Sequence, residues 1–153
     1  MTVEELQEAI HIELELIEAT LLELSSLRSD VADKEPTVRE KTAAASFMAQ
    51  FYSGIENILK RISHYYSIPL PKGDLWHIEL FKRFCSPAYK NLPVLFDEPL
   101  ALRMAPYRKF RHVVFHGYGF QLGWDRMKEG IEHIDDVFVE FKIKLTEYIM
   151  SLK

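Results

Sequence analysis

Apolar residues recur at alternating spacings of three and four along most of the chain, a pattern typical of amphipathic α-helices. The first helix is expected to begin at Val3, because Thr2 and Glu5 form a capping box in front of it. This helix should fade near Ser29-Asp30. Its apolar seam is predicted to consist of Ile10, Leu14, Ile17, Leu21 and Leu24.

The middle of the chain predicts a second long helix and a short third one. The second helix runs from about Thr37 to Tyr66 and stops at the proline-rich segment 68–71, since proline cannot continue a helix. Gly54 within it would let a neighbouring helix approach closely. Asp74 is expected to cap the third helix, which runs from Leu75 to about Phe84. The buried stripe of the second helix is predicted to be Ala44, Met48, Phe51, Ile55, Ile58 and Ile62.

The last part of the chain predicts a loop and two further helices. Segment 86–98 contains two prolines and is expected to be irregular, and a fourth helix should run from about Pro99 to Phe115, with a disturbance near Pro106. Gly117 and Gly119 should end it. The apolar seam of the final helix is Met127, Ile131, Ile134, Phe138, Phe141, Leu145, Tyr148 and Leu152. We therefore expect a single domain, 1–153, folded as an all-α antiparallel bundle of about five helices.

The composition of the chain supports a hydrophobic core that needs no disulfide bonds. Hydrophobic residues make up 48% of the chain, enough for an apolar interior, and the single cysteine, Cys85, is expected to be a small core residue. The first residues carry no export signal, and no apolar run reaches the roughly 18 residues that a membrane span requires. A cytoplasmic protein with no membrane contact is therefore expected.

Charge is distributed unevenly along the chain, whose net charge is −4. Residues 1–35 carry ten acids and two bases, whereas residues 72–112 carry four acids and eight bases. A basic middle in an acidic chain favours an anion-binding surface there, although such runs are also typical of solvated faces. The acidic first helix is a candidate surface for a basic partner.

The segment from Arg108 to Tyr118 gathers the groups that could carry chemistry. It contains Arg108, Lys109, Arg111, His112, His116 and Tyr118, interrupted by the apolar trio 113–115, which is expected to anchor the segment in the core. Arg111 and His116 lie about 140° apart on an ideal helix. They can form one site only if the helix ends between them or if a second subunit supplies the complementary copy.

These residue types suit the cleavage of RNA. Attack by a ribose 2′-hydroxyl on the adjacent phosphate needs a proton acceptor and a proton donor, and histidine can do either task near neutral pH. Arginine matches the oxygens of the charged phosphate with a planar fork. A structural arginine and a histidine placed at the helix end by the dipole are the alternative reading.

Other histidines offer weaker signals. His112 and His116 have the spacing of a zinc pair, but no further ligand stands at a matching distance in the sequence, so we expect no metal and no cofactor. Trp76 and His77 open the third helix, where packing is the expected role. His64 closes the second helix, where a cationic side chain suits the helix dipole.

The motif Arg111-x4-His116-x-Tyr118, late in an all-helical chain, resembles the signature of HEPN-domain proteins. The chain is similar in particular to the HepT-like ribonuclease toxins of HepT–MntA toxin–antitoxin pairs, a type VII-like system. The phrases Gly73-Asp74-Leu75-Trp76-His77, Tyr107-Arg108-Lys109-Phe110-Arg111-His112 and Tyr118-Gly119-Phe120-Gln121-Leu122 carry the same resemblance, which covers essentially the whole chain.

The resemblance implies a HEPN-type bundle that forms a homodimer with a composite, metal-independent RNase cleft. Arg111 and His116 would be the catalytic pair, and transfer RNA is the implied substrate class. Tyr118 would be the residue that a MntA-like nucleotidyltransferase antitoxin modifies with AMP to silence the toxin. Arg108, Lys109 and His112 would support RNA binding, with His112 standing where many relatives have asparagine.

Two other functions fit the same sequence. The chain could be a non-catalytic HEPN module that binds a nucleotide or scaffolds a partner, with the basic cluster only holding phosphate. It could also be a structural dimer that uses its long helices as an interface. Cleavage of RNA in the presence of EDTA, or its absence, separates the first function from these two.

Overall fold

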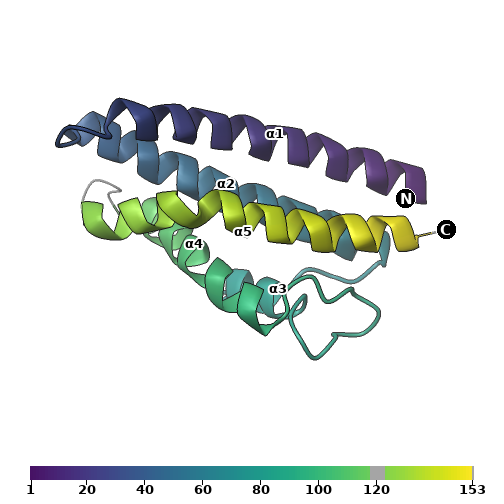
Figure 1. Ribbon diagram of the computed structural model, residues 1–153. Coiled ribbons are helices and arrows are strands. Elements are labelled where there is room, and N and C mark those ends of the chain that lie inside the picture. The colour runs from purple at the N-terminus through teal and green to yellow at the C-terminus, as the bar shows by residue number, and fades with distance from the viewer. Residues whose placement is uncertain (118–122, 153) are drawn as a thin grey trace.

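Five helices form a bundle in the computed structural model, which describes residues 1–117 and 123–152. They are α1 (Val3–Asp30), α2 (Val38–Tyr65), α3 (Trp76–Lys82), α4 (Glu98–His116) and α5 (Trp124–Ser151). The two first helices are antiparallel, and α5 runs in the same direction as α2, with α3 and α4 on the other side of α2 from α1 (Figure 1). Helix α2 contacts each of the other four and is the centre of the bundle. The predicted all-α class is confirmed.

The capping boxes set the starts of the two first helices. The Thr2 hydroxyl accepts a hydrogen bond from the Glu5 amide, and the Glu5 carboxylate accepts one from the Thr2 amide. Thr37 and Glu40 repeat the arrangement in front of α2. Each box satisfies two amides that would otherwise have no partner in the helix, so both helices begin within one residue of the predicted position.

Helices α1 and α2 pack closely along their predicted seams. All five seam residues of α1 and all six of the α2 stripe are buried. At Gly54 an added Cβ atom would lie 2.5 Å from Cγ1 of Ile17, so only glycine lets the two backbones come this close. The expected role of Gly54 is confirmed.

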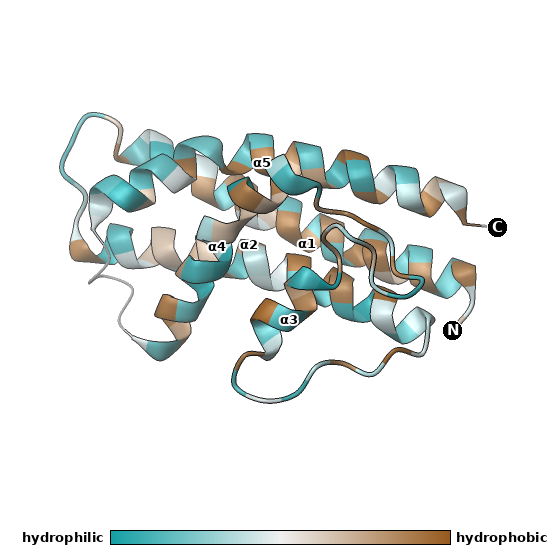
Figure 2. Cartoon of the chain, turned by 90° about the horizontal axis from the view of Figure 1, so that it is seen from below, coloured by the Kyte–Doolittle hydropathy of each residue, from teal (hydrophilic) through white to brown (hydrophobic). Residues whose placement is uncertain are grey.

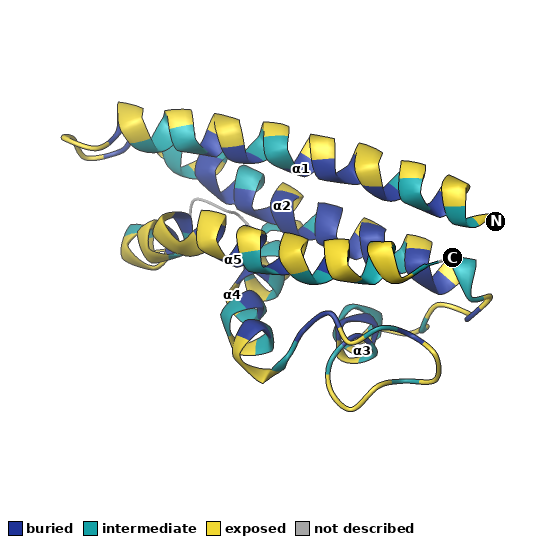
Figure 3. Ribbon diagram, turned by 45° about the vertical axis from the view of Figure 1, so that its right-hand side comes forward, coloured by how far each residue is buried: buried dark blue, intermediate teal, exposed yellow. Residues whose placement is uncertain are grey.

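The acidic residues of α1 face mainly outward, and most of its exposed surface lies on the side away from α2 (Figure 3). Glu13 is the exception, since it is buried and lies 3.7 Å from the Arg61 guanidinium of α2. Lys142 of α5 pairs with Glu18 at 2.6 Å, and this contact fastens α1 to α5. Burial of the apolar seam, rather than charge, therefore holds α1 on the bundle.

Aromatic side chains join α2 to α4 and α5. The Phe51 ring meets Tyr107 and Phe138 edge to face, with centroids 5.4 and 6.3 Å apart. The Tyr107 hydroxyl donates a hydrogen bond to the Gly130 carbonyl at 2.7 Å, which satisfies a polar group inside this cluster. Apolar and polar positions alternate around each helix (Figure 2), and no helix in the described ranges is long and apolar enough to cross a membrane.

One sequence-based expectation about a helix start is wrong, and one about the continuity of a helix is confirmed. Asp74 does not cap α3, whose N-cap position is Leu75 without any side-chain hydrogen bond. Pro106 lies inside α4, which continues past it as a helix to His116, as expected. The proline nitrogen has no hydrogen to donate to the Leu102 carbonyl. Pro106 and Leu102 are both exposed, so water can donate this hydrogen bond instead.

The segment between α3 and α4 is irregular, as expected, but it is anchored. The amides of Leu95 and Phe96 both donate to the Phe84 carbonyl, and all three side chains are buried. Asp97 then caps α4 by accepting from the Leu100 amide at 3.0 Å. Cys85 is half-buried against the core, where burial raises the pKa of its thiol. The expectation of a small core residue there is met in part.

Candidate functional site

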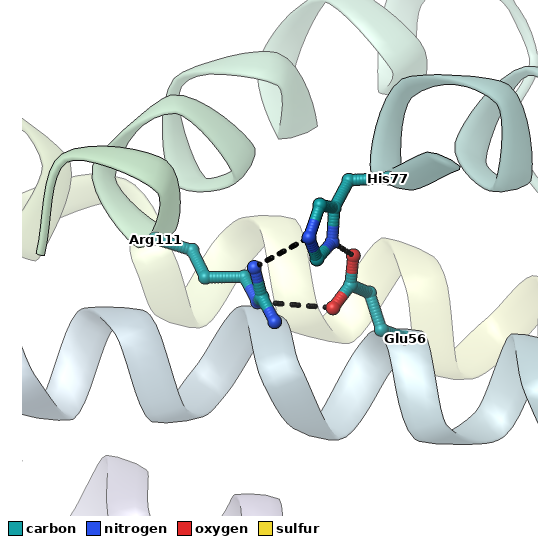
Figure 4. Close-up of polar contacts among 3 residues, drawn as sticks. All are labelled: Glu56, His77 and Arg111. Atoms are coloured by element: carbon teal, nitrogen blue, oxygen red, sulfur yellow. Dashed lines mark hydrogen bonds and ion pairs between the residues drawn. The ribbon is translucent and has the colours of Figure 1, made fainter. Parts of the chain in front are cut away.

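Three helices bring Arg111, Glu56 and His77 together beside the C-terminal half of α4 (Figure 4). The Glu56 carboxylate, from the middle of α2, lies 2.7 Å from Nδ1 of His77 through Oε2 and 3.0 Å from Nε of Arg111 through Oε1. Nη1 of Arg111 lies 3.2 Å from Nε2 of His77. The three side chains therefore form a closed ring of polar contacts.

Glu56 is the most deeply buried member, with 2% of its side chain exposed, against 16% for Arg111 and 18% for His77. A buried carboxylate is costly unless charged or polar groups pair with it. The Glu56 carboxylate accepts a hydrogen bond from His77 and forms an ion pair with Arg111. The Nε atom of Arg111 is close enough for the ion pair but is not aligned for a hydrogen bond. The ring thus compensates the buried charge and orients the guanidinium.

Aromatic rings enclose the Arg111 guanidinium. Its carbon lies 4.7 Å from the Phe115 ring centroid and 5.9 Å from that of Trp76. Lys60 of α2 lies over the same Trp76 ring at 4.8 Å. Such cation–π contacts restrict where a cationic side chain can point. The site therefore combines a held arginine, a nearby lysine and two aromatic faces.

Tyr52 lies one turn before Glu56 in α2 and is fully buried. Burial raises the pKa of its hydroxyl well above the ordinary value, the Glu56 carboxylate raises it further, and Arg108 and Arg111 lower it. The hydroxyl therefore stays protonated at any physiological pH. Among the described residues it has no hydrogen-bond partner.

His116 closes the last turn of α4, and Gly117 is the C-cap residue. The helix does not end between Arg111 and His116, so the first of the two alternatives, a helix end between them, does not hold. His116 is exposed and its ring lies 4.5 Å from that of His112, whereas Arg111 points toward α2 and α3. Within the described residues no hydrogen bond or ion pair joins Arg111 to His116. One chain by itself does not bring the two together.

The apolar trio between them does not anchor the segment in the core, contrary to expectation. Phe115 is 62% exposed and Val113 is 36% exposed, and only Val114 packs partly against the core. Three successive residues of a helix spread over about 200° of its circumference, so they cannot all face inward. The end of α4 instead presents apolar surface to solvent.

The other predicted site residues lie on different sides of α4. Arg108 is half-buried, with its guanidinium 5.8 Å from the Phe81 ring of α3. Lys109 is exposed and lines a hollow of about 650 Å³ between α4 and α5. His112 is exposed beside His116. Tyr118, the predicted modification site, lies outside the described residues. No cluster that could hold a metal ion occurs among the residues described.

A family model described as HepT-like protein matches residues 43–152. This chain belongs to the HepT-like family. Comparisons with curated proteins and with solved structures find no match. The matched range of this HepT-like chain contains Glu56, His77 and Arg111, whereas α1 precedes it.

Two residues of this candidate site, Glu56 and His77, are not predicted by the sequence analysis. Glu56 is a single acid beside Ile55 in the buried stripe of α2, and a charge in such a position signals a paired group. His77 was assigned to packing, although it lies in the phrase 73–77 that carries part of the family resemblance. Neither has a sequence spacing to Arg111 that would reveal the contact, because three separate helices supply them.

Proposed function

We propose that this HepT-like protein is a metal-independent ribonuclease toxin in which Arg111 and His116 cleave RNA. The observation that carries the proposal is the way Arg111 is held. Its guanidinium pairs with the buried Glu56 carboxylate of α2, and Arg111 lies at the same end of α4 as His116. Transfer at a phosphodiester needs a fixed cation and an imidazole that can exchange a proton, and α4 carries one residue of each kind. Membership of the HepT-like family supports the same reading.

The reaction is an internal transfer at phosphorus. The ribose 2′-oxygen forms a bond to phosphorus as its proton passes to a neutral imidazole, and the bond from phosphorus to the 5′-oxygen breaks as that oxygen takes a proton. The products are a 2′,3′-cyclic phosphate and a free 5′-hydroxyl. Arg111 stabilises the extra negative charge that develops on the phosphate oxygens.

A second copy of the chain completes the cleft in this proposal. Arg111 and His116 point to different sides of α4, and Phe115 and Val113 leave apolar surface exposed between them. Apposition of two α4 ends would cover this surface and bring the second copy's His116 toward Arg111. One imidazole would then accept the 2′-hydroxyl proton while the other protonates the leaving oxygen.

Regulation would act at Tyr118, two residues after His116 in the sequence. A MntA-like nucleotidyltransferase antitoxin would attach AMP to its hydroxyl. The attached phosphate and nucleoside would occupy the space of the substrate phosphate and repel it. Transfer RNA is the substrate class we propose, with Arg108, Lys109 and His112 contacting its backbone.

The test is cleavage of a transfer RNA mixture by the unmodified protein in EDTA. We expect Arg111→Ala and His116→Ala to lower cleavage by about 100- to 1,000-fold. Arg103→Ala is the matched control, because Arg103 lies on the same helix but pairs with Glu140 at the surface, and it should cleave like wild type. If wild-type protein free of any modification on Tyr118 leaves RNA intact, the proposal fails.

A non-catalytic nucleotide-binding module is the second candidate. The hollow between α4 and α5 favours it, because Phe110 and Val137 give it apolar walls while Lys109 and Arg126 bring positive charge. Calorimetric titration with AMP and with ATP measures nucleotide binding directly. Saturable binding by a protein that leaves RNA intact would select it over the ribonuclease.

A further inference from the structure

His77 uses both of its ring nitrogens in the ring of contacts around Arg111. Nδ1 lies 2.7 Å from the Glu56 carboxylate, and Nε2 lies 3.2 Å from Nη1 of Arg111 (Figure 4). His77 stands in the first turn of α3, whereas its two partners come from α2 and α4. Its side chain is 18% exposed, so water has limited access to these contacts.

The chemistry of the two partners fixes the proton on His77. An ionised carboxylate can only accept hydrogen bonds and a guanidinium can only donate them. The imidazole between them must therefore donate to Glu56 from Nδ1–H and accept from Arg111 at an unprotonated Nε2. A second proton on Nε2 would set an N–H group against the N–H groups of Arg111. The contacts thus select one neutral tautomer.

We propose that His77 is a positioning residue of the cleft, which holds Arg111 through the Nδ1–H tautomer that Glu56 selects. The inference rests on the proposed ribonuclease function and adds a residue to it. Glu56 alone contacts only the Nε side of the guanidinium, and His77 supplies the second contact at Nη1, which fixes the rotation of the planar group. Nη2 has no ion pair or hydrogen bond within the described ranges and is left for a phosphate oxygen.

The alternative is that His77 only attaches α3 to α2. Two substitutions separate these roles. His77→Gln keeps a donor for Glu56 and an acceptor for Arg111, whereas His77→Leu fills similar space with neither group. His64→Gln is the matched control, since His64 is exposed at the end of α2 and touches none of the three residues of the site.

We expect His77→Leu to lower kcat for RNA cleavage by about 10- to 100-fold, because a misplaced catalytic group costs rate. KM should change less than about threefold, because the positive charge of Arg111 that attracts the substrate phosphate is still present. His77→Gln should recover most of kcat, and His64→Gln should match wild type. Equal kcat for His77→Leu and wild type would overturn the proposal, as would a folded His77→Gln as slow as His77→Leu.

Nitrogen NMR of wild-type protein tests the tautomer without any cleavage assay. The His77 signals should show a protonated Nδ1 and an unprotonated Nε2, and a proton on Nε2 contradicts the proposal even if His77→Leu does not fold. In His77→Gln the Arg111 side-chain N–H signals should keep slow exchange with water. A wild type that cleaves no RNA would remove the proposed function, while these signals would still decide how Arg111 is held.

Discussion

The α1–α2 pair and the last turns of α4 are stabilised by different forces. In the pair, apolar seams face each other across the glycine at position 54, and the acids of α1 mainly face solvent. At the end of α4 the pattern is reversed, because the charged Arg111 points inward to Glu56 while Phe115 is exposed. Nonpolar burial is non-directional, whereas the polar ring requires particular atoms at particular distances.

The difference separates the residues that make the bundle from those that make the site. A region stabilised by buried apolar side chains tolerates substitutions of its polar surface residues. A region stabilised by a buried ion pair loses its geometry when one partner is removed. Exposed apolar residues beside a held arginine add little to the stability of the isolated chain. They are what a surface that receives another molecule would present.

The largest effect should come from Phe51, the aromatic residue that joins α2 to α4 and α5. We expect Phe51→Ala to lower the free energy of unfolding by about 3–5 kcal/mol, because it leaves a cavity in the core. Phe115→Ala removes an equal side chain that is 62% exposed and should cost less than about 1 kcal/mol. Urea unfolding monitored by circular dichroism measures both. Equal losses would remove the distinction between the two regions.

Removing one charge from the ring should have the next largest effect. In Glu56→Gln one of the two acceptor oxygens becomes a donor, which then faces His77 or Arg111. We expect about 1–3 kcal/mol less stability and a clear loss of RNA cleavage. Glu13→Gln is the control from the other region, because Glu13 is buried but has longer contacts to Arg61 and Asn57. Unchanged cleavage in Glu56→Gln would show that Arg111 needs no carboxylate.

Two glycines compare how closely helices approach in the α1–α2 pair and where α5 meets α2. Gly54→Ala should cost about 1–3 kcal/mol, because the new methyl group meets Cγ1 of Ile17. Gly130→Ala meets the flexible end of Met48, so the gain in helix propensity should nearly offset the shift of that side chain. Thermal unfolding compares the two variants, and RNA cleavage should be unchanged in both. A Gly130→Ala variant as unstable as Gly54→Ala would contradict this account.

The smallest effect should come from one of the polar contacts between α1 and α5, the pair of Lys142 and Glu18. Lys142 and Glu18 are both nearly half exposed, so water and salt screen their pairing. We expect Lys142→Ala to cost about 0.5 kcal/mol or less, with a difference from wild type that shrinks at high salt. Denaturation at two salt concentrations checks this. A loss above about 1 kcal/mol would show that charge, and not the apolar seam, holds α1.

Helical periodicity was enough to predict the bundle, because burial of an apolar stripe leaves its spacing in the sequence. The seams of α1 and α2 followed from it, while the capping box before α1 predicted the start of that helix and the prolines after α2 predicted its end. The exposure of Phe115 could not be predicted this way, since a short apolar run has no period of its own. The continuity of α4 through Pro106 is expected from the sequence, but the exposure of Leu102 and Pro106 that permits it depends on the tertiary structure.

The site could be predicted only in part, because Arg111 and His116 are close in sequence whereas their surroundings are not. Glu56 and His77 lie 55 and 34 positions before Arg111, and tertiary folding alone brings them to it. A charge in an apolar stripe was the available signal for Glu56. For His77 the residue type does not distinguish a packing role from a role in the site, since imidazoles both pack in cores and bind polar groups.

Trp76 also gives this protein an optical reporter. The chain has two tryptophans, and the indole of Trp76 lies 3.4 Å from the His77 ring by centroid, with Lys60 and Arg111 near its face. Indole emission is sensitive to neighbouring cations and imidazoles. In a Trp124→Phe background, the tryptophan emission of the chain therefore comes from one residue beside Arg111. Any molecule that draws the guanidinium toward itself will change that emission, so binding can be followed in real time without a label.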